Sequence, residues 1–137
     1  LSDDARAATQ AEEHGVVVTV GQPNSLQQCA ADGGTWNGER LISEEWIDFV
    51  RTPAPATAAT GEQYGGQWWL VPNTRDDIPA DAYSTAGNRG QYVVVVPSHD
   101  LVIVRRGLDY GRQGFNRWDL TREVLKAFSR VSDQDRD

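Results

Sequence analysis

One stretch decides the fold: Gln91-Tyr92-Val93-Val94-Val95-Val96, then Pro97-Ser98-His99-Asp100, then Leu101-Val102-Ile103-Val104-Arg105-Arg106. Two apolar runs rich in β-branched residues, with a four-residue turn between them, predict a β-hairpin. Both runs are continuously apolar instead of alternating with polar residues, which indicates that both faces of the strands are covered. We therefore expect this hairpin in the interior of an antiparallel sheet.

Weaker strand signals lie on either side of the hairpin. Residues 67–71 and 83–87 precede it, and the β-branched run 16–20 lies near the start of the chain. Residues 3–13 are rich in Ala and Glu and favour a weak helix. These segments predict an antiparallel sheet of about three to four strands.

Two further segments predict helices that flank the sheet, which makes the expected fold class α+β. Ser43 can cap a helix in which Trp46, Phe49 and Val50 form the apolar face and which Pro53 ends. The second helix follows a capping-box pattern, and its apolar stripe is expected to pack on the sheet. This pattern and stripe consist of Asn116 and Asp119, then Leu120, Val124, Leu125, Phe128 and Val131.

The composition narrows the classes of partner and cofactor. A net charge of −7 and a pI of about 4.7 disfavour binding to nucleic acid or to an anionic membrane. Cys29 is the only cysteine, and His14 and His99 lie far apart, so we expect no disulfide, no metal and no cofactor. No run reaches the ~18 apolar residues of a membrane span. The acidic start does not resemble a signal peptide.

A search for a nucleophile finds none. The only lysine is Lys126, and no serine has a lysine three residues later, so the Ser-x-x-Lys pattern is absent. Ser98-His99-Asp100 contains the residue types of a catalytic triad, but neighbours on one turn cannot adopt its geometry. Trp68 and Trp69 allow two interpretations, an exposed sugar-binding platform or two strand faces with one ring in the core.

A series of short motifs nevertheless resembles, in order, the C-terminal part of the β-lactamase-like (penicillin-recognising) serine hydrolases. The resemblance covers about 97 residues, from 33 to 129. The motifs are Gly34-Thr35-Trp36-Asn37-Gly38-Glu39-Arg40-Leu41-Ile42, Glu45-Trp46, Thr52-Pro53, Tyr64-Gly65-Gly66-Gln67-Trp68-Trp69, Ala86-Gly87-Asn88-Arg89-Gly90-Gln91 and Val96-Pro97-Ser98-His99-Asp100-Leu101-Val102.

The resemblance implies a site at residues 88–91. In the family a third motif, Lys-Thr/Ser-Gly or His-x-Gly, lines one wall of the active-site cleft, and Asn88-Arg89-Gly90 stands in its place here. Asn88 departs from the family's charged residue, whereas Gly90 matches it. The resemblance gives the backbone N–H of Gln91 the role of one oxyanion-hole donor. The other donor would belong to the nucleophilic serine, so the catalytic set is incomplete.

Three segments follow from these observations. Residues 1–32 do not resemble the family. Two explanations stay open: ordinary divergence, or a truncated or frame-shifted gene. Residues 33–131 resemble the C-terminal part of a serine hydrolase domain, and 132–137 form a charged tail. The intact protein would cleave a small ester or amide by acyl transfer. This chain alone is expected to be inactive, and a non-catalytic binding module is the alternative. We expect its partner to be a second copy of the chain, through self-association, or an N-terminal complementing segment. The cellular compartment stays open, although proteins of this family are often exported.

Overall fold

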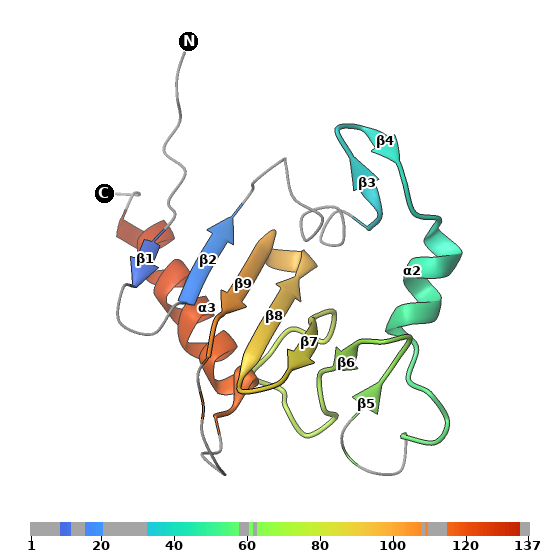
Figure 1. The fold of residues 1–137 in the computed structure, drawn as a ribbon. Helices are drawn as coiled ribbons and strands as arrows, with labels where there is room; N and C mark the ends of the chain where they lie inside the picture. Colours follow the sequence, from blue (N-terminus) through green and yellow to red (C-terminus); the bar gives the residue numbers. More distant parts are fainter. Residues whose placement is uncertain are drawn as a thin grey trace.

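The computed structural model describes residues 9–11, 16–20, 33–57, 61, 63–107, 109 and 115–134. In these ranges, seven strands form an antiparallel sheet in the order β1-β2-β9-β8-β7-β6-β5, and β3 and β4 form a separate pair (Figure 1). The strands are β1 Thr9–Ala11, β2 Val16–Val20, β3 Thr35–Trp36, β4 Glu39–Arg40, β5 Gln63–Tyr64, β6 Trp69–Leu70, β7 Tyr83–Gly87, β8 Gln91–Val96 and β9 Leu101–Arg105. The helices are α2 Glu44–Arg51, the short 3₁₀ helix η1 Pro97–His99 and α3 Arg117–Gln134.

The predicted hairpin is confirmed and lies inside the sheet. β8 pairs with β9 from Tyr92↔Arg105 to Val96↔Leu101, and η1 makes the turn between them. β7 flanks β8 on one side and β2 flanks β9 on the other. The α+β class is confirmed, whereas the predicted sheet of three to four strands is too small. β5 and β6 have two residues each, too few to show a strand period.

The N-terminal part of the chain joins this sheet. All five residues of β2 pair with β9, and β1 extends the sheet by pairing with β2. The prediction of a weak helix over residues 3–13 is wrong for residues 9–11, because pairing with β2 overrides their helix propensity; the remaining residues of that stretch lie outside the described ranges. The expected leader therefore contributes two strands to the main sheet.

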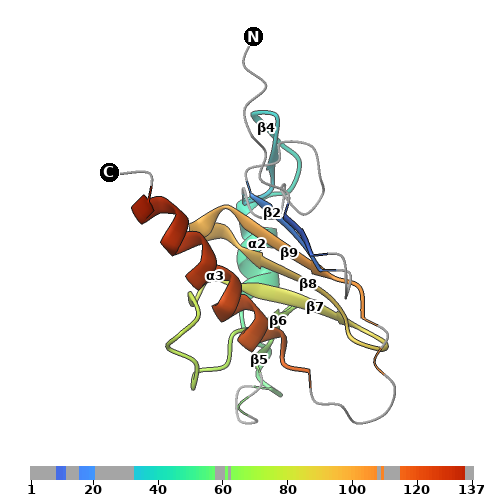
Figure 2. The same cartoon turned by 90° about the vertical axis from the view of Figure 1, so that its left-hand side faces the viewer.

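The hairpin is buried on both faces, which explains its continuous apolarity. Side chains of β8 and β9 that face α3 pack with Trp118, Leu120, Val124, Leu125 and Phe128 of that helix. Val131, also predicted in this stripe, lies outside the residues whose side chains are described. On the other face, Val95 and Val102 pack with Leu70 and Tyr83. Burying each such side chain contributes about 1.5–3 kcal/mol. Figure 2 shows α3 lying along one face of the sheet and α2 on the far side.

The start of α3 is capped as predicted, but only half of the capping box forms. Oδ1 of Asn116 accepts hydrogen bonds from the backbone N–H groups of Trp118 and Asp119, at 2.9 and 3.3 Å. The carboxylate of Asp119 turns instead to Arg75, 2.9 Å away, and so ties the loop between β6 and β7 to the helix. α3 continues to Gln134, into the stretch expected to be a charged tail.

α2 has the predicted cap but a different buried face. Oγ of Ser43 accepts a hydrogen bond from the N–H of Trp46 at 3.2 Å. Val50 is buried as predicted, together with Ile47, whereas Trp46 and Phe49 are 56% and 59% exposed. The expected apolar face is therefore wrong for these two aromatic residues, because the backbone at Gly65 and Gly66 packs against Val50 and leaves the rings outward.

The two adjacent tryptophans point to different neighbours, and neither is fully buried. Trp68 meets the ring of Tyr83 edge-on at 4.9 Å and packs on the cluster opposite α3. Trp69 meets Tyr64 at 4.8 Å, and the guanidinium of Arg117 lies 5.4 Å from its ring. The alternation of strand faces thus describes this pair better than an exposed platform does.

Deleting residues 1–32 should destabilise the protein and promote self-association. The deletion removes β1 and β2, which leaves β9 with an unpaired edge. Losing the backbone hydrogen bonds of five paired residues should cost on the order of 3 kcal/mol or more. Urea unfolding and size-exclusion chromatography with light scattering would measure both effects. Deleting residues 1–8 alone is the control; an equally stable monomer without residues 1–32 would contradict the role given to β2.

Candidate cleft wall at the β7–β8 turn

The four residues predicted to line a cleft lie together at the turn between β7 and β8. Gly87 pairs with Gln91 as the last pair of these strands, and Asn88-Arg89-Gly90 connects them. Arg89 and Gly90 both have left-handed backbone angles, with φ of 59° and 76°. Asn88 and Arg89 are exposed and Gly90 is buried, so the turn offers two polar side chains above a packed backbone.

Arg105, at the end of β9, holds the turn from below. Its guanidinium donates a hydrogen bond from Nη1 to the carbonyl oxygen of Gly90 at 2.7 Å. Nη1 and Nη2 also donate to the two carboxylate oxygens of Asp109, at 2.9 and 2.8 Å. Arg105 is only 8% exposed, whereas the side chain of Asp109 is 21% exposed, so water is excluded from this two-pronged ion pair mainly on the arginine side. We call these two side chains the Arg105–Asp109 brace.

The carbonyl of Gly90 belongs to the same peptide group as the N–H of Gln91. Because a peptide group is planar, a hydrogen bond that fixes the carbonyl also fixes the direction of the N–H. Two more contacts hold the segment: the N–H of Asp109 donates to the carbonyl of Arg89 at 3.1 Å, and the side-chain amide of Gln91 donates to the carbonyl of Gly107. The brace therefore sets the backbone geometry of the candidate site.

Two glycines make this packing possible. A Cβ atom on Gly90 would overlap both side chains of the brace. A Cβ atom on Gly107 would overlap Arg105 and the backbone carbonyls of Arg89 and Gly90. Sequence reasoning identified Gly90 but missed Arg105, Gly107 and Asp109. The available signal was an arginine that ends an apolar strand, followed four residues later by an aspartate.

Aromatic rings cover the brace and connect it to α3. The guanidinium carbon of Arg105 lies 3.7 Å from the centre of the Phe115 ring, and Phe115 stacks on Tyr92 at 5.8 Å. Arg117, the first residue of α3, lies 5.8 Å from the same Tyr92 ring. Such cation–π contacts favour a planar, weakly hydrated guanidinium and are strengthened by burial.

The brace also shifts the titration of its carboxylate. The hydrogen bonds from Arg105 lower the pKa of Asp109 below the ordinary value of 3.8, and partial burial opposes this effect. The attraction of the guanidinium charge lowers the pKa of Asp109 further. Asp109 is therefore ionised at neutral pH and serves as the anchor of the arginine, not as an acid catalyst.

The sequence predicts that the turn after β8 forms no catalytic triad, and its geometry agrees. Oγ of Ser98 lies 3.0 Å from Nδ1 of His99, but the same hydroxyl donates to the carboxylate of Asp81 at 2.9 Å. A triad needs the carboxylate to orient the imidazole, whereas here it meets the serine. All three residues of Ser98-His99-Asp100 are exposed.

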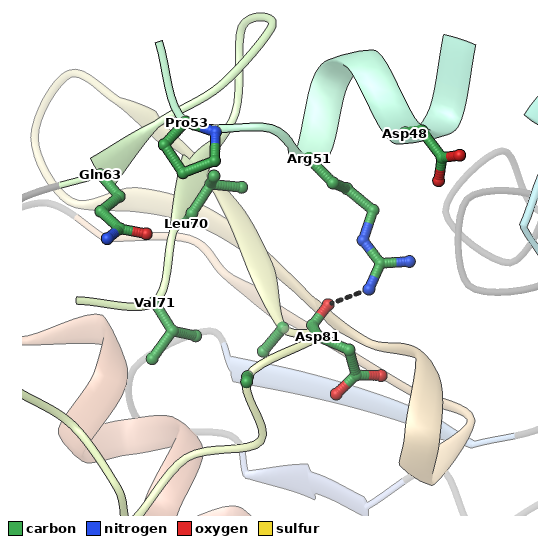
Figure 3. Close-up of a pocket in the computed structure, with 9 residues that line it drawn as sticks. Asp48, Arg51, Pro53, Gln63, Leu70, Val71 and Asp81 are labelled. Atoms are coloured by element: carbon green, nitrogen blue, oxygen red, sulfur yellow. Dashed lines mark hydrogen bonds between the residues drawn. The ribbon is translucent and has the colours of Figure 1, made fainter. Parts of the chain in front are cut away.

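A pocket of about 370 Å³ lies at the other end of β7, beside α2 (Figure 3). Arg51 donates a hydrogen bond to the backbone carbonyl of Asp81 at 3.3 Å across it, and its guanidinium lies 5.6 Å from the ring of Tyr83. Asp48 and Gln63 add polar groups, and Leu70 supplies an apolar wall. This pocket is separate from residues 88–91, because those residues follow the opposite end of the strand.

In the described ranges, no three His, Cys, Asp or Glu side chains converge as they would to hold a metal ion. None of the helices in the described part of the chain is both long enough and apolar enough to cross a membrane.

Comparison with known proteins gives two related similarities. The chain is 31% identical over 83 residues to a 6-aminohexanoate-dimer hydrolase from Paenarthrobacter ureafaciens, an alignment covering 54% of this chain and 20% of that protein. A solved structure, provisionally named as a 6-aminohexanoate-dimer hydrolase from Bacillus anthracis, superposes with a TM-score of 0.51 at 17% identity. That superposition covers 80% of this chain and 27% of the other. No protein-family model matches the chain.

These similarities agree with the motifs in the sequence at a coarse level. The second one shows a shared fold alone, because its sequence identity is low. The chain spans about a fifth of the first relative and about a quarter of the second. The chain is thus similar, in part of its sequence and in its fold, to hydrolases of the β-lactamase-like kind.

Replacing Gly90 or Gly107 by alanine should destabilise the protein by about 2–3 kcal/mol, because the added methyl group overlaps the brace. Gly38→Ala is the matched control. Gly38, like Gly90, has a positive φ, of 80°, but a Cβ atom there would meet nothing within 4 Å, so the backbone strain alone should cost about 1 kcal/mol. Urea unfolding would compare the three variants, and equal losses would contradict the close packing at the turn.

The variant Asp109→Asn should lower stability at neutral pH, and its difference from wild type should shrink in acid. The pKa of Asp109 is lowered in the folded state, so its ionised form stabilises the fold above the ordinary value of 3.8. That contribution is lost as the pH falls through the lowered pKa. The measurement is the free energy of unfolding of both proteins between pH 7 and pH 2. A difference that stays constant over this range would show that the brace is not ionic.

Proposed function

We propose that this chain contributes the C-terminal strands and one cleft wall of a serine hydrolase that cleaves a small ester or amide by acyl transfer. The observation that carries the proposal is the agreement of two similarities, one in sequence and one in fold, with proteins that bear the same hydrolase name. The ordered motifs between residues 33 and 129 are consistent with it. By its name, the first relative hydrolyses a 6-aminohexanoate dimer, which makes an amide the preferred substrate class here.

In this proposal the β7–β8 turn faces the substrate. Gly90 allows the backbone to approach closely, and the N–H of Gln91 stabilises the oxyanion that forms when the carbonyl is attacked. Asn88 and Arg89 are the exposed side chains nearest to that position, and Arg89 supplies the positive charge that Asn88 lacks. The Arg105–Asp109 brace keeps the turn rigid during the reaction, because oxyanion donors are effective only when they are fixed beforehand.

The proposal places the nucleophile outside these 137 residues. None of the chain's seven serines has the required lysine three residues later. A serine hydroxyl needs a nearby base to become a nucleophile, and Lys126 lies on α3. Hydrolysis therefore requires a further segment that carries Ser-x-x-Lys.

A non-catalytic interaction module is the second candidate. One observation favours it: Trp46 and Phe49 lie on the surface of α2, where large aromatic side chains are unusual unless they bind something. The two candidates differ in whether the β7–β8 turn matters for activity once a nucleophile is present.

The test is hydrolysis with and without a nucleophile-bearing segment. The purified chain should not cleave the linear 6-aminohexanoate dimer, a p-nitrophenyl ester or a chromogenic β-lactam above the buffer rate. Coexpression with the part of the Paenarthrobacter relative outside the 83 aligned residues, which the proposal requires to carry Ser-x-x-Lys, should restore cleavage. Arg105→Lys in this chain should then reduce kcat more than it changes KM. Turnover by the chain alone would refute the proposal. A complex without activity would favour the interaction module.

A further inference from the structure

One apolar surface of the molecule has no function in the proposed chemistry. Leu41, Trp46 and Phe49 are 57%, 56% and 59% exposed, and the rings of Trp46 and Phe49 lie 5.3 Å apart. We call Trp46 and Phe49 the α2 patch. The other large hydrophobic side chains that are exposed in the described part of the chain are Leu41 and Phe115.

The structure holds the α2 patch rigidly. The opposite face of α2 is buried through Ile47 and Val50, and the N–H of Gly66 donates to the carbonyl of Val50 at 3.0 Å. At the other end, Arg40 joins Glu44 by an ion pair of 2.7 Å, which ties β4 to the helix. A partner therefore meets a helix whose backbone is already ordered, which lowers the entropy that binding costs.

Acidic residues surround the α2 patch. Glu39, Glu45 and Asp48 are exposed beside it, and Glu44 already neutralises the nearby Arg40. A second copy of the chain would bring the same negative rim against this one, so like charges would oppose a symmetric dimer. Charge complementarity instead favours a partner with an apolar centre and flanking lysines or arginines.

We propose that the α2 patch docks the segment that carries the Ser-x-x-Lys nucleophile, through an amphipathic helix whose apolar side is flanked by basic residues. This inference rests on the proposed function, because only a hydrolase requires a segment that carries the nucleophile. The length of the relatives supports it: this chain spans 20% of one and 27% of the other. The position of α2 is consistent with it, since α2 and α3 lie on different sides of the sheet (Figures 1 and 2).

The experiment measures binding between the 137-residue chain and the part of the Paenarthrobacter relative outside the 83 aligned residues, coexpressed and purified by a tag on this chain. The wild-type chain should retain the partner, and Trp46→Ser with Phe49→Ser should lower the affinity at least tenfold. Lys126→Ser is the control, an exposed side chain on α3 outside the candidate site, and should leave the affinity unchanged. Glu45→Lys should weaken binding, and the wild-type affinity should fall as the salt concentration rises.

The outcomes separate this inference from the proposed function. Hydrolysis that is restored but insensitive to the patch variants would leave the function standing and overturn the docking site. Binding that needs the patch, without any hydrolysis, would support the docking site and refute the function. A complex with unchanged affinity in the patch variants, or no complex at all, would overturn the inference. So would a wild-type homodimer that Trp46→Ser dissociates, because the occupant would then be a second copy. Urea midpoints within error of wild type would show that the variants are folded.

Discussion

Burial of the β8–β9 hairpin on both of its faces is the constraint on which the rest of the structure depends. Val94 and Ile103 face α3, while Val95 and Val102 face the opposite cluster, and all four are almost completely buried. A strand pair of this kind cannot exist at an edge or on an open surface. It requires β2 and β7 at its sides and α3 across one face, and the chain supplies each of them.

The hairpin also determines where the candidate site lies. β9 ends at Arg105, directly opposite Tyr92 near the start of β8, so the guanidinium arrives beneath the β7–β8 turn. From there it can bind the carbonyl of Gly90 and the carboxylate of Asp109 at once. A buried arginine must be paired and hydrogen-bonded to be tolerated, and these contacts meet that need. The same contacts orient the peptide group that the proposed chemistry uses.

The sequence predicts the parts of the fold that have a strong local signal. The hairpin, both helix caps and the packing of α3 follow from apolar periodicity and capping residues. The outer strands do not, because β5 and β6 are too short to show a period and β1 gains its structure only by pairing with β2. The outward rings of α2 were missed for a related reason: the close approach of Gly66 to Val50 is a tertiary contact that helical spacing cannot encode.

The sequence predicts a candidate site at residues 88–91, but it does not indicate which contacts hold this turn in place. The resemblance to a family points to residues 88–91, and Gly90 matches the glycine that lets the backbone approach closely there. The brace joins residues whose relation depends on the strand register, since Arg105 and Gly90 are distant in sequence and meet only after β8 and β9 pair. The spacing of Arg105 and Asp109 is a local signal for their ion pair, but no short motif links that pair to Gly90.

The most direct measurement is the mass-spectrometric location of a fluorophosphonate label in the complex of this chain with a nucleophile-bearing segment. Fluorophosphonates react with activated serines, so the label reports which chain holds the nucleophile. The account predicts one label on the serine of the Ser-x-x-Lys segment and none on the seven serines of this chain. A stoichiometric label on this chain, at Ser98 or any other serine, would contradict it.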